Sequence, residues 1–151
     1  MNERLGRQLA LTQKAVRAEF EDRLAKVGGS LSTWILLDHA LEEGQLSQSL
    51  LAQRMWIEGP TLVRHLDRLE GEGLVERRRD TSDRRVVRVT VTSAGKVLYR
   101  RLRAVADAME ATLTAALTEQ EHRTLLRALR RLHAAVVSPA KEEVAHEQHA
   151  R

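Results

Sequence analysis

The stretch RRRDTSDRRVVRVTV, from Arg77 to Val91, combines a dense charge pattern with the alternation of a β-strand. Val87, Val89 and Val91 are two residues apart, so they point to one side of an extended chain. A shorter extended run precedes them, and the four residues DTSD at 80–83, which favour turns, join the two runs. The stretch therefore predicts a β-hairpin whose arginines crowd the tip and both shoulders.

The charge of this hairpin is concentrated. Six arginines and two aspartates lie between Arg77 and Arg88, an excess that equals the net charge of +4 for the whole 151-residue chain. A focused cationic loop is typical of polyanion binding, and a thin loop that carries arginine fits the narrow, negative minor groove of DNA. We expect Asp80 and Asp83 to act within the loop, because a carboxylate that accepts hydrogen bonds from turn amides or from an arginine holds the loop in shape.

A helix with two different faces precedes the hairpin. Pro60 lies in its first turn, where the missing N–H costs nothing, and Gly73 is expected to follow its last turn with a positive φ. Leu62, Leu66 and Leu69 form the expected buried stripe. The opposite face carries polar and cationic side chains, namely Thr61, Arg64, His65 and Arg68.

The polar face of this helix suits the major groove of double-stranded DNA. A helix about 10–12 Å across fits that groove, and arginine can hydrogen-bond both O6 and N7 of guanine. We predict that Arg64 contacts a base and that Thr61, with the first-turn amides around Pro60, holds a phosphate. For His65 and Arg68 two interpretations stand, a DNA contact or an ordinary solvated position, since acidic neighbours on the same helix can pair with Arg68.

Three further helices are expected before Pro60. The first covers residues 3–26 and is broken by the glycines that follow it. Ser30 caps the second, LSTWILLDHALEE, and Ser47 caps the short third, QSLLAQRM. The spacing of the second helix places four apolar residues on one face, namely Leu31, Trp34, Leu37 and Leu41.

Two helices are expected after the hairpin. Thr92 caps the first of them, which carries apolar residues at near-heptad spacing. TEQE, at 118–121, matches a capping box and starts the last helix. Four residues of that helix are expected to be buried, namely Leu125, Leu129, Leu132 and Val136. The polar segment after Pro139 is expected to be a frayed tail.

Two helices joined by a tight turn, a helix ended by glycine and an arginine-tipped hairpin together make a winged helix-turn-helix. The expected fold is mainly α with a small β-hairpin wing, combined with a helical dimerisation domain. The expected boundaries are 1–29 for an N-terminal dimerisation helix, 30–92 for the DNA-binding domain, 93–138 for C-terminal dimerisation helices and 139–151 for the tail.

Composition excludes several classes of function. The chain has no cysteine, so disulfides, thiolate zinc sites, a cysteine nucleophile and a thiol redox sensor are excluded. The six histidines lack the spacing of a metal site, and no phosphate-binding glycine loop or catalytic serine motif is present, so no enzyme, metal or cofactor is expected. No apolar run approaches the roughly 18 residues of a membrane span, and no signal peptide opens the chain, which favours a cytoplasmic protein.

The segment LLAQRMWIEGPTLVRHLDRLEGEGLVERRRDTSDRRVVRVTVTSAG, residues 50–95, strongly resembles the DNA-binding core of MarR-family transcription regulators. Within it, IEGPTLVRHLDRLEGEGLV is most similar to the SlyA-like branch, and D-x-x-D-R-R followed by a hydrophobic strand and T-x-x-G is a family signature. The resemblance runs from about Leu5 to Val137. It implies a homodimer whose terminal helices pack into a shared domain, with two wings straddling a palindromic operator. The alternative is a monomer that covers its own apolar stripes.

The same resemblance implies roles for individual residues. Arg64 matches the arginine that contacts bases, Arg85 matches the wing arginine that enters the minor groove, and Asp83 matches the aspartate that buttresses it. Arg84, beside Arg85, is included in the predicted DNA contact. Trp56 departs from the family by replacing a usual glycine, which predicts either a distorted turn or an aromatic anchor. A second departure concerns the wing, where Ser82 stands at a position that is often arginine.

Many members of the family bind small phenolic or aromatic carboxylate ligands, and this resemblance implies an effector site here. Trp34 occupies a position that often lines such a site, and Arg17 and His39 are the predicted carboxylate clamp and hydrogen-bonding partner. Each has a second interpretation, with Trp34 as a core anchor and Arg17 as a solvated helix residue. The predicted function is a homodimeric, ligand-released repressor that binds specific double-stranded DNA. The alternative is a winged-helix module that binds RNA or an acidic protein without an operator.

Overall fold

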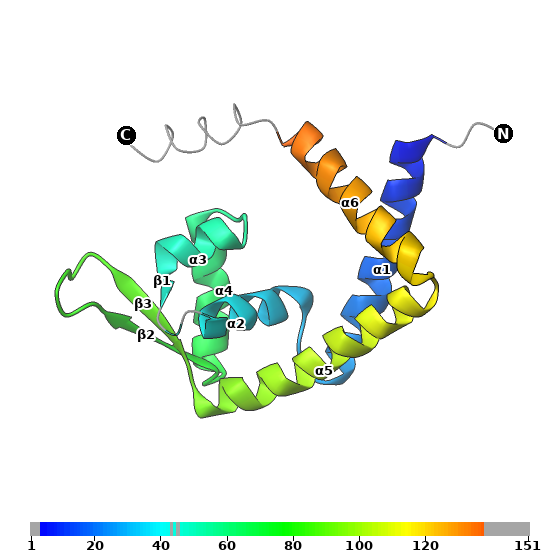
Figure 1. The fold of residues 1–151 in the computed structure, drawn as a ribbon. Coiled ribbons are helices and arrows are strands. Elements are labelled where there is room, and N and C mark those ends of the chain that lie inside the picture. Colours follow the sequence, from blue (N-terminus) through cyan, green and yellow to red (C-terminus); the bar gives the residue numbers. More distant parts are fainter. Residues whose placement is uncertain (1–3, 43, 45, 138–151) are drawn as a thin grey trace. The chain divides into compact units, whose positions relative to one another are not determined.

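The computed structural model describes residues 4–42, 44 and 46–137, and this part of the chain is mainly helical with one small sheet (Figure 1). The described residues up to Met109 form one compact unit, the winged unit, and those from Glu110 onward form a second. The predicted tail lies outside the described residues. The elements in chain order are α1 (Leu5–Lys26), α2 (Leu31–Glu42), β1 (Leu46–Ser47), α3 (Gln48–Arg54), α4 (Gly59–Gly71), β2 (Val75–Arg79), β3 (Val87–Val91), α5 (Ser93–Ala115) and α6 (Glu119–Val136).

The predicted helix starts are confirmed by their hydrogen bonds. The hydroxyl of Ser30 accepts from the amide of Thr33 at 3.2 Å, and that of Ser47 accepts from the amide of Leu50 at 3.2 Å. Thr118 and Glu121 make the reciprocal pair of a capping box at the start of α6. Each cap satisfies amides that the first turn of a helix leaves without partners, so the caps set where the helices begin.

The core of the winged unit lies where α2, α3 and α4 meet the sheet. Leu62, Leu66 and Leu69 of α4 are fully buried, as predicted. The four apolar residues predicted to share a face of α2 all lie in or against this core, with Leu37 fully buried and Leu31, Trp34 and Leu41 half-buried. Thr33, Leu36 and Ala40, outside that set, are buried as well. The physical reason is that α2 contacts α1, α3, α4 and β3, so more than one stripe of the helix is covered.

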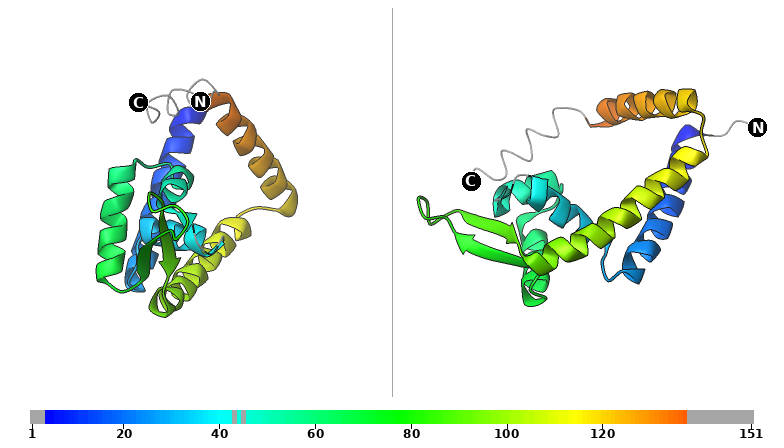
Figure 2. Two further views of the ribbon diagram at one scale, coloured as in Figure 1. Left: turned by 90° about the vertical axis from the view of Figure 1, so that its left-hand side faces the viewer. Right: turned by 60° about the horizontal axis from the view of Figure 1, so that its bottom comes forward.

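The sheet is antiparallel with the order β1-β3-β2, and the β2–β3 hairpin is the predicted wing, whose loop extends away from the helices of its unit in Figure 1 and in the right view of Figure 2. Val75 pairs with Val91 and Arg79 with Val87. On the other side of β3, Leu46 pairs with Val89. Strand β1 was not predicted, because two residues are too few to show an alternation.

The start of α5 is held within the winged unit by polar contacts. The Thr92 hydroxyl donates to the carbonyl of Gly73 at 2.7 Å and accepts from the amide of Gly95 at 3.1 Å, which confirms the predicted cap. One turn further, the Tyr99 hydroxyl donates to Asp38 of α2 at 2.6 Å. Burial, and then this carboxylate, raises the pKa of Tyr99 above its ordinary value. The first turns of α5 are therefore held against α2 and against Gly73, in the segment that joins α4 to β2.

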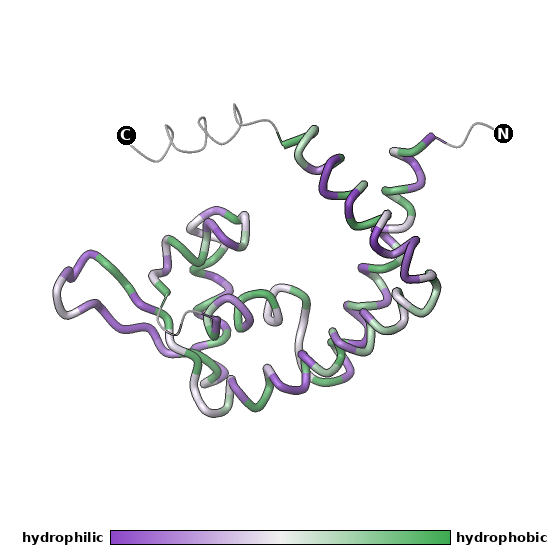
Figure 3. The backbone as a smooth tube through the Cα atoms, viewed as in Figure 1, coloured by the Kyte–Doolittle hydropathy of each residue, from purple (hydrophilic) through white to green (hydrophobic). Residues whose placement is uncertain are grey.

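The prediction that α6 buries its apolar stripe is wrong for the single chain. No residue of α6 is buried, Leu125 and Leu129 are exposed, and Val136 keeps 74% of its surface exposed. In Figure 3 hydrophobic positions recur along α6 between hydrophilic ones. A lone helix cannot cover its own stripe, so the described part of the second unit leaves this stripe open to solvent. None of the described helices has the length and apolar character that crossing a membrane requires.

Gly95 is expected to tolerate no side chain. A Cβ atom there would lie 2.1 Å from the backbone oxygen of Leu74 and 2.7 Å from Cγ1 of Val91. Because the first of these atoms belongs to the backbone, Gly95→Ala is expected to lower the free energy of unfolding by about 3 kcal/mol in urea denaturation. Gly71→Ala is the matched control, since a Cβ at Gly71 meets no atom within 4 Å. Equal stability of the two variants would contradict this packing.

Candidate nucleic-acid interface

The outer face of α4 consists of Thr61, Arg64, His65 and Arg68, opposite the buried leucines. Pro60 lies in the first turn, as predicted, and Gly73 after the helix has φ of 70°. Arg64 is exposed, and the described residues supply no hydrogen bond to its side chain, whereas Thr61 and His65 are half-buried. The face therefore presents one exposed guanidinium group and two half-buried polar side chains.

Arg68 differs from Arg64 because its guanidinium is engaged within the chain. It donates to the hydroxyl of Thr33 in α2 at 2.9 Å and to the carboxylate of Glu72 at 3.3 Å. Thr33 is itself buried and bonded to Ser30, the cap of α2. These contacts favour the interpretation of Arg68 as a residue that joins α4 to α2, and its DNA contact stays a prediction.

Arg77 ties the wing to α4. Its Nε atom and one terminal nitrogen donate to Glu70 at 3.0 and 2.7 Å, and its backbone amide donates to the same carboxylate at 2.9 Å. The terminal nitrogen also contacts Asp67 at 2.5 Å. The guanidinium holds the pKa of Glu70 below its ordinary value. Sequence reasoning missed this group, although acidic residues three apart on α4 facing the first wing strand were a usable signal.

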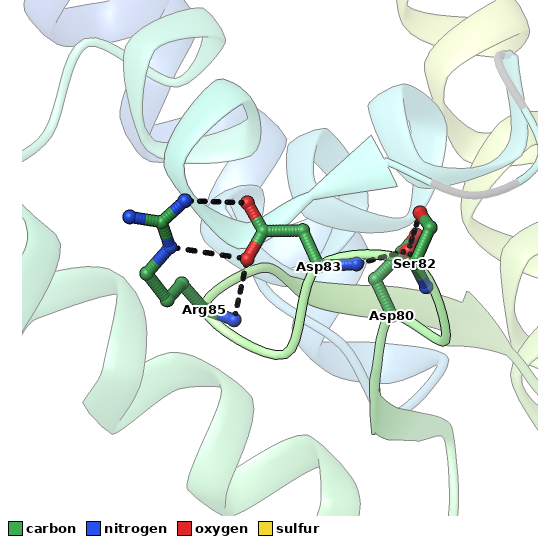
Figure 4. Close-up of polar contacts among 4 residues, drawn as sticks. All are labelled: Asp80, Ser82, Asp83 and Arg85. Atoms are coloured by element: carbon green, nitrogen blue, oxygen red, sulfur yellow. Dashed lines mark hydrogen bonds and ion pairs between the residues drawn. The ribbon is translucent and has the colours of Figure 1, made fainter.

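Asp80 organises the loop of the wing (Figure 4). Its Oδ1 atom accepts from the amide and hydroxyl of Ser82 at 2.8 and 2.5 Å and from the amide of Asp83 at 3.1 Å. Its Oδ2 atom accepts from Nε of Arg88 on β3. The Ser82 hydroxyl, followed by Arg88, holds the pKa of Asp80 far below its usual range. The expectation that the wing aspartates act within the loop is confirmed for this residue.

Asp83 holds Arg85 in the same loop. Its Oδ1 atom accepts from the backbone amide of Arg85 at 3.0 Å and from the Nε atom at 3.2 Å, and Oδ2 lies 3.4 Å from a terminal nitrogen (Figure 4). The guanidinium lowers the pKa of Asp83. Arg85 nevertheless keeps 91% of its side chain exposed, and its neighbour Arg84 is exposed too. The loop thus presents a cation whose direction is set by a carboxylate.

A helix with an exposed arginine, joined to a hairpin with a second exposed arginine, is the arrangement that the sequence predicted. Residues 30–87 match the MarR family. This segment is therefore similar to the domain that the family model describes.

Solved structures resemble nearly the whole chain as well. A probable transcriptional regulator from Pseudomonas aeruginosa is 26% identical, with a TM-score of 0.77 over 87% of this chain and 98% of that one. The MepR–DNA complex of S. aureus is 21% identical, with a TM-score of 0.81 over 89% and 99%. BpsR of Bordetella bronchiseptica, described as regulated in its DNA binding by 6-hydroxynicotinic acid, is 21% identical, with a TM-score of 0.76 over 87% and 99%. These likenesses confirm the winged-helix fold with its flanking helices.

The residues predicted to hold an effector have separate partners. Trp34 packs against Phe20 with ring centroids 5.4 Å apart and an edge-to-face angle of 73°, on the border of the hydrophobic core. Arg17 is exposed and lies 3.8 Å from Glu21. His39 is half-buried, with Nδ1 3.7 Å from Glu42, beyond hydrogen-bond length. Two surface hollows, one beside Thr92 and one at the wing loop, are lined by none of the three predicted residues.

Residues 30–87 and the helices that flank them contain no cluster of metal-binding side chains among the described residues. No three histidine, aspartate or glutamate side chains gather there closely enough to hold an ion.

Removing the Asp80 carboxylate is expected to loosen the wing loop. Asp80→Ala takes away the acceptor of the Ser82 and Asp83 amides, so hydrogen exchange at these two amides should speed up by about tenfold or more. Exchange followed by NMR gives the result residue by residue. Thr81→Ala, in the same loop, is the control and should leave both amides unchanged. Unaltered exchange in Asp80→Ala would mean that the carboxylate does not order the loop.

Proposed function

We propose that the protein is a homodimeric transcriptional repressor of the SlyA-like branch that binds a palindromic double-stranded DNA operator. The single observation that carries the proposal is the pairing of Arg64, exposed on the outer face of α4, with Arg85, exposed on a wing that Arg77 fastens to α4. Two exposed guanidinium groups on rigidly joined elements suit the adjacent major and minor grooves of one duplex.

The division of labour between the two arginines follows from the shapes of the grooves. Helix α4 fits a major groove about 12 Å wide, where Arg64 is proposed to contact a base while Pro60, Thr61, His65 and Arg68 lie along the groove walls. Arg85 and Arg84 are proposed to enter the minor groove, with Asp83 limiting the side-chain entropy that Arg85 loses on insertion. The solved complexes of MepR with DNA and of E. coli MarR with operator DNA have this fold and support the proposal.

A second copy of the chain is proposed to cover the apolar residues that one copy leaves exposed. They lie on α1 and α6, and they include Leu5, Leu11, Leu125, Leu126 and Val136. Exposed stripes at both ends of the described chain favour a shared helical domain built from segments 1–29 and 93–138. Such a dimer presents two copies of α4 to successive major grooves, about 34 Å apart.

A small aromatic or phenolic carboxylate is proposed to release the repressor, with Trp34, His39 and Arg17 as its contacts. The Nε1 atom of Trp34 and the Nδ1 atom of His39 are buried without a hydrogen-bond partner among the described residues. A buried polar atom without a partner is costly, so an oxygen-bearing ligand gains from bonding it. The regulation of BpsR by 6-hydroxynicotinic acid supports an effector of this class.

The function is tested by selecting duplexes from a random pool with the purified protein. The expected product is a palindrome, bound as one dimer per site, with an affinity that falls with salt at a slope near −0.9 per neutralised phosphate. Light scattering of the free protein should give the mass of a dimer. A palindrome that binds no better than its shuffled sequence would overturn the proposal and favour a partner such as RNA or an acidic protein.

The two arginines are expected to fail differently when each is replaced. Arg64→Ala should cost about 1–3 kcal/mol of binding free energy on the selected site and relax the preference at one base position. Arg85→Ala should weaken binding mainly where the flanks are rich in A·T pairs. Affinities measured on a panel of single-base variants of the site give both profiles.

Lys14→Ala serves as the charge control for this pair, because Lys14 is exposed on α1. Lys14→Ala should leave the affinity for the selected site and for each of its single-base variants nearly unchanged. An Arg64→Ala protein that weakens on all sequences alike would show that Arg64 contacts a phosphate instead of a base.

A further inference from the structure

Trp56 occupies a backbone position that this chain otherwise gives to glycine. Among the described residues it is the one non-glycine residue with positive φ, at 53°. The glycines with positive φ are Gly28, Gly44 and Gly73, which follow the ends of α1, α2 and α4. Trp56 follows α3 in the same way, although a side chain makes this conformation unfavourable.

The turn itself is undistorted. After α3, the amide of Trp56 donates to the carbonyl of Gln53 at 3.0 Å and that of Ile57 donates to the carbonyl of Ala52 at 3.1 Å. After α4, the amides of Gly73 and Leu74 make the same two bonds, at 2.9 and 2.8 Å. Trp56 therefore stands at the αL position of an ordinary Schellman cap, and the expectation of a distorted turn is wrong.

The expectation that Trp56 anchors the turn is wrong as well. Its neighbours Met55 and Ile57 pack on the core, whereas Trp56 keeps 74% of its surface exposed. No hydrogen bond or ring contact of its side chain occurs within the described part of the chain. The position thus carries two unfavourable features, a strained backbone and an exposed indole, and no hydrogen bond or ring contact to another described residue offsets either.

The place of Trp56 in the chain suggests what does contact it. Only Ile57 and Glu58 separate it from the start of α4, whose outer face carries Thr61 and Arg64. If the first turns of α4 lie in a major groove, a residue so near the helix start lies beside one wall of that groove. The wall is sugar and phosphate. An indole suits it, because the flat ring packs on deoxyribose and the single N–H donates to a phosphate oxygen.

We infer that Trp56 is a DNA-backbone contact that flanks the major-groove contact of α4. This inference rests on the proposed DNA-binding function. The contact is uncharged and independent of sequence, so it adds affinity without adding to the salt dependence or to the base preference. It also accounts for a tryptophan at a site where glycine fits the backbone better.

Trp56→Gly is the deciding variant, because stability and binding should change in opposite directions. Removing the strained side chain is expected to raise the melting temperature by about 2–5 °C. The same change should weaken binding about five- to tenfold, on the selected palindrome and on its shuffled sequence alike, with the salt slope unchanged. Trp56→Phe keeps the strain and a ring but lacks the N–H, so it should retain part of the lost affinity. Unchanged affinity of Trp56→Gly for both duplexes would overturn the inference.

Labelling with 5-fluorotryptophan separates this inference from the function on which it rests. The protein gives one ¹⁹F signal for Trp34 and one for Trp56, and the signal that Trp56→Phe lacks is assigned to Trp56. On addition of duplex, the Trp56 signal should shift and lose its sensitivity to exchange of H₂O for D₂O. A protein that binds duplex while this signal stays solvent-exposed overturns the inference and leaves the function standing. A protein that binds no duplex overturns both.

Discussion

The joint between α4 and the wing is the constraint on which the candidate interface depends. One side chain, Arg77, uses both its guanidinium and its backbone amide to hold Glu70, and the guanidinium reaches Asp67 as well. The buried leucines of α4 fix the other side of that helix in the core. The outer face of α4 and the first strand of the wing are thereby fixed relative to each other, which restricts the separation of Arg64 and Arg85.

The arginines of the wing are chemically alike but differ in what they do. Arg77 joins the first wing strand to α4 through Glu70, and Arg88 pairs with Asp80. Arg85 is both restrained by Asp83 and open to solvent. Acidic residues beside a cationic surface weaken its attraction for a polyanion, but here each carboxylate restricts the conformations of a neighbouring arginine or amide. A restricted cation loses less entropy on binding than a free one.

Much of the fold could be predicted, because the chain marks its helix ends with local signals. Ser30, Ser47, Thr92 and Thr118 each bond within four residues, so the sequence alone contains both partners. Strand β1 could not be predicted, because it exists only through its pairing with β3 far along the chain. The apolar stripe of α6 was predicted correctly as a helix face but wrongly as buried. Its spacing shows that the residues are apolar and does not show which surface covers them.

In the candidate site too, contacts between residues close in sequence could be predicted, and contacts between distant elements could not. The outer face of α4 and the Asp83–Arg85 pair were predictable, because the residues that form each of them are only a few positions apart in the sequence. The bond of Arg68 to Thr33 and that of Arg77 to Glu70 join different elements, so composition and spacing do not contain them. The backbone conformation of Trp56 was also missed. A glycine in the sequence usually marks the residue of positive φ that follows a helix, but here a tryptophan adopts that conformation.

The environment of Asp80 has a consequence for how the wing responds to acid. A carboxyl group whose folded pKa is depressed contributes stability above its unfolded value near 4 and loses that contribution only as the pH falls toward the folded value. Asp80 therefore stays ionised from mildly alkaline to mildly acidic pH. The hydrogen bonds that the ionised carboxylate accepts from Ser82, Asp83 and Arg88 are therefore kept across that range.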